Sequence, residues 1–432
     1  MTPLPLHEFH HDLGAQFAGL NGAEIVNDYG GWLAEHVALR QSAGVLDLSF
    51  RSRICLTGAD RVRFLHGQVT NDVKKLRAAE GCYAAITTNK GKMESDLNIF
   101  NLPDELLLDF EPGLSGKISQ RLQQFIVADD VQVVDVAPHY GLLSVQGPKA
   151  EEAVRALGLF EWGERPHEPI LADGPSGPSV ASPHQFPSKP FASVKISNAT
   201  LGEIFLMNHA RLSSFPLPAK RGEGQGEGPN ATSSPRSTPP FHEGEGENIC
   251  SGFDLFVPNA SLGAVADKLI SAAKQIGGRP CGWQAFETAR IEAGIPRFGR
   301  DMDETNLPLE CGIENRAVSY KKGCYIGQEV LNRIHSFGHV TKELRGLRLP
   351  DDLKALPLRG DKLFHDGKEI GYLTSAVKSP TFGNIALGYV RREMNQIGNE
   401  LTLKTAAGES PAKIVELFEA WRRLGRAPQT VL

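Results

Sequence analysis

The composition of the chain changes sharply over residues 171–248, where glycine, proline, serine and glutamate replace most of the apolar residues. Such a stretch cannot bury enough apolar surface to offset its conformational entropy. Two short runs inside it, residues 194–197 and 203–209, still have the pattern of strands. We therefore predict a disordered insert at residues 213–248 and a looser loop at residues 173–190. Most inserts of this kind are tolerated surface segments, although a charged, flexible segment can also bind a partner.

Length and charge exclude several classes of protein. A chain of 432 residues with an ordinary globular composition predicts two or three domains with a sizeable core. A net charge of −5 gives no reason to expect direct nucleic-acid binding. Residues 1–19 lack a basic start and an apolar stretch, and no apolar run is long enough to span a bilayer. We therefore expect a soluble, cytoplasmic monomer with no membrane partner.

The cysteines lie far apart in the sequence, at Cys55, Cys82, Cys250, Cys281, Cys311 and Cys324. Because no Cys-x-x-Cys pair occurs, a zinc ribbon or an iron–sulfur cluster held by this chain alone is not expected. A disulfide framework is also unexpected in a chain of this size without a secretory signal. We expect most of these cysteines to be reduced core residues.

The first part of the chain has both helical and extended patterns. We predict helices over residues 35–42 and 58–65, and strands over residues 53–56, 82–88, 93–100, 131–136 and 142–145. Leu114, Ile118, Leu122 and Ile126 recur every four residues, which indicates an amphipathic helix. A strand, a glycine and a helix occur twice, around Gly58 and around Gly147. Two similar α/β halves would produce this repeat, and chance would produce it almost as easily.

The last part of the chain is predicted to be all β. Before it, we predict a strand over residues 252–258 and helices over residues 262–276 and 283–293. From Leu344 onward the pattern is one of short strands and turns, and Asp366-Gly367 is a favourable hairpin turn. This pattern predicts a small antiparallel barrel or sandwich.

Residues 321–329 combine chemical groups for which a core strand or helix has no use. The run Lys321-Lys322-Gly323-Cys324-Tyr325-Ile326-Gly327-Gln328-Glu329 brings together a thiol, two cations, an amide, a carboxylate and two glycines. Glycine allows a tight bend or a close approach, and a neighbouring lysine favours a thiolate at Cys324. The run predicts either a functional loop or a tight turn before a helix, with Cys324 as a small buried residue.

Several motifs together resemble the glycine-cleavage T-protein, an aminomethyltransferase that uses tetrahydrofolate. They are Glu35-His36-x-Ala38-x-Arg40-x-x-x-Gly44-Val45-x-Asp47-x-Ser49, Phe64-Leu65, Thr70-Asn71-Asp72 and Arg290-Ile291-Glu292-Ala293-Gly294. By contrast, Lys322-Gly323-Cys324-Tyr325-x-Gly327-Gln328-Glu329 resembles the hallmark of the folate-binding YgfZ branch of that superfamily. The resemblance covers nearly the whole chain, apart from the insert and the first two dozen residues.

The resemblance implies an α+β fold of three domains, arranged as a cloverleaf around a central folate channel. Two related α/β domains would cover residues 24–140 and 141–294, and the insert at residues 213–248 would interrupt the second. Residues 295–340 would return to the first domain, and residues 341–420 would form a C-terminal antiparallel β-barrel.

The sequence departs from the T-protein pattern at two positions. T-proteins carry a paired Asp-Asp after the glycine-rich turn, where an aspartate faces a folate nitrogen, whereas here Ser95 precedes Asp96. T-proteins also carry Thr-Gly-Glu before a Gly-Phe pair, and its glutamate holds the pterin, whereas Cys250 stands at that place here. The resemblance therefore leaves open whether the pterin is still recognised.

For the candidate residues of the YgfZ-like run, the resemblance implies roles that stand beside simpler alternatives. Cys324 would be the functional thiol, and it would bind metal only with ligands from a partner, since one cysteine cannot hold a cluster. Lys322 would raise the thiolate fraction of Cys324 or be merely solvated, and Tyr325 would contact the ligand. Gln328 and Glu329 would orient the loop or bind the ligand, or else form a solvated first helical turn.

A second set of candidates would belong to the folate channel. Asp96 would lie near a folate nitrogen as a base or electrostatic stabiliser, or would be an exposed strand acid. Arg290 would meet the anionic glutamate tail of folate or a channel carboxylate, or form an ordinary surface pair. Asn71 and Asp72 would line the channel or cap the following turn.

Our interpretation is a YgfZ-like, folate-binding accessory protein that supports the assembly or repair of iron–sulfur enzymes. Its cofactor would be tetrahydrofolate or a derivative, and its partners would be iron–sulfur assembly proteins or client enzymes. The alternative is a tetrahydrofolate-dependent aminomethyltransferase or related one-carbon transferase. A third option, suggested by Cys250, is a degenerate member that no longer binds folate.

Overall fold

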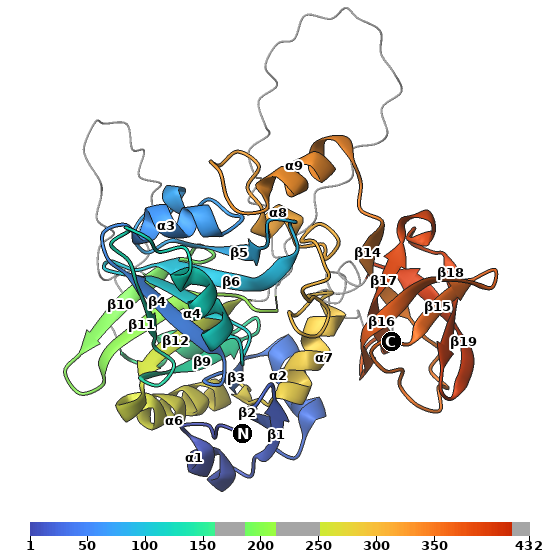
Figure 1. Cartoon of the computed structure of the whole chain (residues 1–432). Coiled ribbons are helices and arrows are strands. Elements are labelled where there is room, and N and C mark those ends of the chain that lie inside the picture. Colours follow the sequence, from blue (N-terminus) through green and yellow to red (C-terminus); the bar gives the residue numbers. More distant parts are fainter. Residues whose placement is uncertain (160–185, 213–250, 417–432) are drawn as a thin grey trace, which may run out of the picture.

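The structure is a computed structural model that describes residues 1–159, 186–212 and 251–416. The predicted insert at residues 213–248, most of the predicted loop at residues 173–190, and Cys250 lie outside the described residues. Figure 1 shows a layered α/β body with a β-barrel beside it, formed by the C-terminal part of the chain. The predicted fold class, α+β with a C-terminal antiparallel barrel, is therefore confirmed.

Five antiparallel strands form the first sheet, in the order β5-β6-β7-β4-β8. Their bounds are β4 Ser52–Thr57, β5 Gly81–Thr87, β6 Met93–Asn101, β7 Leu106–Phe110 and β8 Gln132–Asp135. The helices that cover one face are α3 (Arg61–Gln68) and α4 (Ser115–Gln123), and η1 (Val73–Lys75) follows α3. Ile118 and Leu122 of α4 are fully buried in the same cluster as Ile54, as their spacing predicts.

Six strands form the second sheet, in the order β10-β11-β12-β9-β3-β13. Their bounds are β3 Gly44–Asp47, β9 Tyr140–Gln146, β10 Ser193–Asn198, β11 Gly202–Asn208, β12 Gly252–Pro258 and β13 Arg279–Pro280. The helices on its outer face are α5 (Ala150–Arg155) and α6 (Asn259–Gln275). All neighbouring strands are antiparallel except β13, which runs parallel to β3.

The two sheets pack against each other through a shared apolar layer. Phe100 and Leu107 of the first sheet lie in one cluster with Leu142 and Phe256 of the second. Full burial of such a side chain stabilises the fold by about 1.5–3 kcal/mol. The body is therefore a four-layer stack, with helices outside and the two sheets inside (Figure 1).

The chain enters the second sheet before it forms the first. β3 pairs with β9, with Val45 opposite Val145, so residues 44–47 belong to the six-stranded sheet. The preceding helix α2 (Trp32–Gln41) packs against α7 (Trp283–Glu292). Residues 44–47 thus join the sheet formed mainly by later parts of the chain, because local pattern does not reveal which sheet a strand joins. The predicted domain boundaries, 24–140 and 141–294 with residues 295–340 returning to the first, stay a prediction.

The two halves share a strand–glycine–helix turn. β4 leads through Gly58 (φ 98°) to α3, and β9 leads through Gly147 (φ 130°) to α5. A Cβ added at Gly58 would lie 2.1 Å from the carbonyl oxygen of Asp130, and one added at Gly147 would lie 2.5 Å from that of Ser42. Both positions therefore need glycine, for its positive φ and for the close backbone approach.

The C-terminal strands close into a barrel in the order β14-β17-β16-β15-β18-β19. Their bounds are β14 Lys342–Arg348, β15 Lys362–His365, β16 Lys368–Ser379, β17 Gly383–Arg391, β18 Glu400–Thr405 and β19 Gly408–Val415, with η2 (Arg392–Met394) after β17. Asp366 and Gly367 join β15 to β16 with positive φ angles of 49° and 76°. They form the hairpin turn that the sequence predicted.

Two regions without predicted elements carry regular structure. The N-terminal region forms α1 (His7–Asp12) and a hairpin of β1 (Gln16–Leu20) and β2 (Ala23–Asp28). Between α7 and the barrel lie α8 (Glu314–Ala317) and α9 (Gln328–Phe337). The backbone of Ser319 donates to the carbonyl of Thr70 at 3.0 Å, so this segment lies against the five-stranded sheet.

Replacing Gly147 with alanine should lower the free energy of unfolding by about 1–3 kcal/mol, because the new methyl group meets the Ser42 carbonyl at a strained φ. Urea unfolding followed by circular dichroism measures the change. Gly67→Ala is the matched control, since Gly67 lies inside α3 with nothing within 4 Å of its added Cβ. Equal effects of the two substitutions would contradict the proposed role of Gly147.

Candidate functional site

The carboxylate of Asp96 has only one of its two oxygens satisfied. Asp96 lies in β6, and the hydroxyl of Tyr83 in the neighbouring strand β5 donates to its Oδ2 at 2.8 Å. Its Oδ1 is buried and has no hydrogen-bond partner among the described residues. Buried polar atoms are nearly always paired. An unpaired carboxylate oxygen therefore indicates a place where a ligand donor can bind.

The environment of Asp96 changes its acidity. Burial raises its pKa to about 6, and the nearby charge of Glu111 acts in the same direction. The hydrogen bond from Tyr83 and the charge of Arg51 oppose this rise without cancelling it. The ordinary pKa of an aspartate is about 4. Asp96 can therefore take up or release a proton near neutral pH, as groups in catalytic sites often do.

Ser95, which replaces the first acid of the T-protein pair, lies on the opposite face of β6. Side chains alternate along a strand, so Ser95 shares a face with Leu97 and Ile99, which pack beneath α3 and α4. Ser95 is completely buried, and its hydroxyl donates to the carbonyl oxygen of Asp96 at 2.9 Å. Ser95 therefore does not occupy the same side of the sheet as the Asp96 carboxylate.

Two buried arginines pair with a carboxylate on the strand next to β6, and the charge of one of them, Arg51, acts on Asp96. Arg51 contacts Oδ1 of Asp109 and Oε1 of Glu111, both at 2.7 Å. Arg211 contacts Asp109 of β7 at 2.9 Å and Asp254 of β12 at 2.7 Å, so it bridges the five-stranded and six-stranded sheets. Burial alone would raise the pKa of Asp109, but Arg211 and Arg51 hold it well below its usual range.

Arg297 connects Glu111 with helix α7 and also lies against an aromatic pair. Its guanidinium lies 3.1 Å from Glu111 and 3.5 Å from Glu287 of α7. The same group stacks over the ring of Trp283 at 5.2 Å, and Trp283 meets Phe50 edge to face at 5.5 Å. Both aromatic residues are only half-buried. They supply a flat apolar surface next to the buried charges.

Arg290 joins helix α7 to the barrel. Its five N–H donors reach both oxygens of Glu287, the carboxylate of Asp301, the carbonyl of Ile295 and the hydroxyl of Ser375 in β16. The side chain is 2 % exposed. Arg290 thus meets carboxylates, one of its predicted alternatives, and no donor is left for the glutamate tail of a folate.

Lys322 ties the YgfZ-like run to the segment after α3. Its ammonium group donates to the backbone carbonyls of His66, Val69 and Asn71. An ammonium group has three N–H donors, so all are used. Burial lowers its pKa to about 8. Lys322 is therefore a buried cross-link with no free donor, and the predicted alternative of a solvated lysine is wrong.

The remainder of the run is divided between surface and core. Cys324 is exposed, so the alternative of a small buried residue is wrong for it. Tyr325 is buried, with its ring 4.8 Å from the Lys322 ammonium and its hydroxyl unpaired among the described residues. Gln328 donates weakly to the carbonyl of Lys322 (3.4 Å), and Glu329 is exposed in the first turn of α9. The run is thus a tight turn before a helix that presents a thiol to solvent.

Asn71 and Asp72 hold neighbouring segments in place. The amide of Asn71 donates to the carbonyl oxygens of Tyr83 and Arg316, both at 2.8 Å. Asp72 forms an ion pair with Lys75 of η1 at 3.1 Å. Asn71 therefore fixes the backbone of the tyrosine that holds Asp96, and so acts on the site through another residue.

Comparison with known proteins assigns the family. The GCVT N-terminal domain matches residues 6–163 and 249–322, and the glycine cleavage T-protein C-terminal barrel domain matches residues 342–418. The chain belongs to the glycine cleavage T-protein family. The crystal structure of the glycine cleavage system aminomethyltransferase T from Bartonella henselae has the same fold, with a TM-score of 0.75, 19% sequence identity and 98% of each chain covered.

Curated relatives of this T-protein family member cover nearly its whole length. An aminomethyltransferase of Shouchella clausii is 24% identical over 413 residues, which is 95% of this chain and 96% of the relative. An aminomethyltransferase of Halalkalibacterium halodurans is 27% identical over 413 residues, with the same coverage. One from Clostridium botulinum is 26% identical over 414 residues, which is 95% of each chain.

These relatives overturn the interpretation of the chain as an accessory protein of iron–sulfur assembly. All three are named aminomethyltransferases, as is the protein with the matching structure, and this agrees with the alternative interpretation. The interpretation failed because it gave one short run, residues 322–329, more weight than the motifs spread along the rest of the chain. The predicted iron–sulfur partners fall with it.

Sequence reasoning missed the buried ion pairs that connect the two sheets next to the strand of Asp96. Arg51, Asp109, Glu111, Arg211 and Asp254 are all nearly or fully buried. A signal was present, since Asp109 follows three leucines in β7 and Asp254 lies within the apolar strand β12. A carboxylate in an apolar strand needs a buried partner. The sequence did not show which arginines supply it.

Among residues 1–159, 186–212 and 251–416, no helix is both long and apolar enough to cross a membrane. Within these same ranges, no three side chains of the His, Cys, Asp and Glu types come together in a way that could hold a metal ion.

Replacing Asp96 with asparagine should stabilise the protein at neutral pH by on the order of 1–3 kcal/mol, because it removes a buried charge. Since its folded pKa is raised to about 6, Asp96 favours folding below pH about 4, and this contribution is lost as the pH rises through about 6. Urea unfolding between pH 4 and 8 measures the effect. Asp104→Asn, at an exposed position, is the control. An unchanged pH dependence in Asp96→Asn would contradict the assignment.

Proposed function

We propose that this chain is a tetrahydrofolate-dependent aminomethyltransferase or a related one-carbon transferase, with Asp96 at the reacting centre. The observation that carries the proposal is the buried Asp96 carboxylate, whose Oδ1 has no partner among the described residues and whose pKa is raised to about 6. Membership of the T-protein family and the names of the relatives support the reaction class.

The residues around Asp96 fit a reduced folate. Tetrahydrofolate carries a flat bicyclic ring with N–H donors, and the unpaired Oδ1 of Asp96 is an acceptor for such a donor. The half-buried rings of Trp283 and Phe50 provide apolar surface for a flat ligand. When bound, tetrahydrofolate would supply the nitrogen atoms that receive the one-carbon unit.

Each residue near Asp96 has a definable task. Tyr83 donates to Oδ2, which fixes the carboxylate and leaves Oδ1 free to accept a hydrogen bond from the substrate. A pKa near 6 keeps most of Asp96 ionised at neutral pH while allowing it to take a proton from a reacting nitrogen. Arg51 neutralises Glu111, which would otherwise repel the ionised form of Asp96 more strongly. Together these contacts place one titratable carboxylate, that of Asp96, beside the proposed position of the folate ring.

Within the family, we propose that the chain belongs to a YgfZ-like branch, which the run at residues 322–329 supports. This proposal concerns the subgroup and leaves the reaction at Asp96 unchanged. Cys324 is an exposed thiol on a segment that the buried Lys322 holds in place, and within the described part of the chain it forms no hydrogen bond with Asp96, Tyr83 or Arg51. The thiol is therefore not assigned a step in one-carbon transfer.

Titration calorimetry with tetrahydrofolate tests the proposed function. Asp96→Asn should weaken binding roughly 10- to 100-fold, because a hydrogen bond to a charged group contributes about 1.5–3 kcal/mol. Affinity of the unmodified protein should rise as the pH increases through about 6, where Asp96 ionises, and this dependence should disappear in the variant.

Cys324→Ser is the control for the same titration, since the exposed thiol makes no contact with the residues proposed to hold the ring. Its affinity for tetrahydrofolate should equal that of the unmodified protein. Unchanged binding by Asp96→Asn would refute the assigned role of Asp96. No binding by the unmodified protein would favour a degenerate member of the family.

A further inference from the structure

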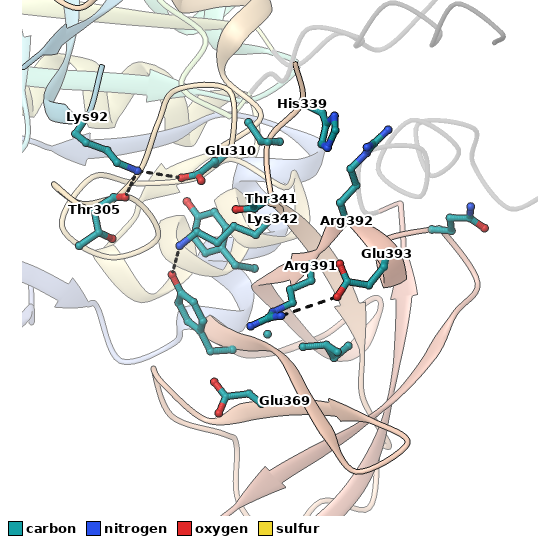
Figure 2. A pocket seen from close by; sticks show the side chains of 16 residues that line it. Lys92, Thr305, Glu310, His339, Thr341, Lys342, Glu369, Arg391, Arg392 and Glu393 are labelled. Carbon is teal, nitrogen blue, oxygen red and sulfur yellow. Dashed lines mark hydrogen bonds and ion pairs between the residues drawn. The ribbon is translucent and has the colours of Figure 1, made fainter. Parts of the chain in front are cut away.

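A large pocket lies between the α/β body and the barrel, away from the contacts of Asp96. It has a volume of about 1060 Å³ and lies among the start of β6, the residues before Cys311 and the barrel strands β14, β16 and β17. Figure 2 shows its lining side chains, with Lys92 and Glu310 on one side and Arg391, Arg392 and Glu393 on the other. Junctions between domains are common places for ligand sites.

The acidic residues of this pocket already have partners. Glu310 accepts a hydrogen bond from the backbone of Leu307 at 3.0 Å and lies 4.0 Å from Lys92. Glu369 pairs with Lys362 at 2.9 Å. The third acid, Glu393, contacts Lys368 at 3.6 Å and Arg391 at 4.0 Å. None of the three carboxylates is therefore left without a basic neighbour.

Two cations of the pocket lack an acidic partner. Lys342 is half-buried, and no carboxylate among the described residues lies within 4 Å of its ammonium group. Its Nζ donates to the hydroxyl of Tyr372 at 3.0 Å and lies 4.7 Å from the ring of Tyr389. Arg392 likewise has no ion pair within the described part of the chain. Asp303, whose charge acts on Lys342 from farther away, is already paired with Arg359. The half-buried ammonium group of Lys342 therefore favours binding of an anion.

We propose that this pocket binds the oxyanion group of a small organic molecule, a carboxylate or a phosphate, between Lys342 and Arg392. Figure 2 places Lys342 near the middle of the pocket, with its hydrogen bond to the hydroxyl of Tyr372 drawn as a dashed line. The bound anion takes the remaining donors of Lys342, and the half-buried ring of Tyr372 covers the organic part of the ligand.

This site is separate from the one proposed at Asp96. Tyr389 lines the pocket but is only 1 % exposed, and its hydroxyl lies 3.1 Å from Sγ of Cys311. Cys311 is itself buried and contacts the sulfur of Met93 at 3.9 Å. Tyr372 and Tyr389 of the pocket lie in one apolar cluster with Tyr83, the residue that holds Asp96, so the two sites adjoin. Asp96, Tyr83 and Arg51 do not line the pocket, so the proposal concerns a different set of residues from the proposed folate contacts.

Calorimetric titration of the full chain at low ionic strength tests the proposal, with citrate and tripolyphosphate as probes of the two oxyanion classes. At least one probe should bind, and the better probe shows whether carboxylate or phosphate is preferred. Lys342→Met and Arg392→Gln should each weaken binding roughly tenfold, as expected for the loss of a charge-assisted hydrogen bond. Circular dichroism checks that both variants fold, and Arg392, which is exposed, is the safer substitution.

Lys404→Met is the matched control. Lys404 also belongs to the barrel and also lies over an aromatic ring, that of Phe364 at 4.5 Å, but it pairs with Glu409 and does not line the pocket. Binding should be unchanged in this variant. The proposal would be overturned if neither probe binds, if Lys404→Met loses as much affinity as Lys342→Met, or if tetrahydrofolate displaces the probe.

Discussion

Buried ion pairs between four arginines and carboxylates from different parts of the fold hold the interior together. Arg211 joins the two sheets, and Arg51 joins carboxylates at one end of the β4–β7 pair. Arg297 contacts Glu287 of α7, and Arg290 connects α7 to the barrel. Removing one partner of a buried pair leaves an uncompensated charge, which costs about 3–5 kcal/mol. Apolar contacts have no fixed direction, whereas these ion pairs require particular positions of the sheets, helix α7 and the barrel relative to one another.

The properties of Asp96 follow from this arrangement of charge. Asp109 is held between two arginines, which keeps its pKa low. Among the described residues, by contrast, the Asp96 side chain accepts a hydrogen bond from the hydroxyl of Tyr83 and forms no ion pair. Burial therefore dominates at Asp96 and raises its pKa to about 6. Two aspartates on neighbouring strands of one sheet thus differ in function, because the first is a structural anion and the second can exchange a proton.

The elements set by local pattern could be predicted from the sequence. The spacing of Ile118 and Leu122 gave the buried face of α4, and Asp366-Gly367 gave the turn between β15 and β16. The hairpin of β1 and β2 was missed, because β1 is half-exposed and does not alternate clearly between apolar and polar residues. The sheet that β3 joins was also not predictable, because its partner β9 lies nearly a hundred residues away in the chain.

The candidate site was only partly predictable, for a related reason. Asp96 was chosen as a candidate through its motif, and its role stays a prediction; its pairing with Tyr83 follows from adjacent strands. The buried arginines next to its strand come from distant parts of the chain, so no spacing rule connects them. Arg211 and Asp254, for example, flank the residues that lie outside the structure, and only folding brings them together. The functional interpretation went wrong where one conspicuous segment was preferred to many weaker signals.

The position of Ser95 changes how its difference from other T-proteins is understood. Adjacent residues of a strand point in opposite directions, so a doublet of acids on β6 would have presented one carboxylate to the interior between the sheets and the other to the helices. Because Ser95 is uncharged, it places no charge in the apolar layer beneath helices α3 and α4. Having serine instead of an acid at position 95 therefore changes nothing on the face of β6 that carries Asp96, which is the face where the folate ring is proposed to bind.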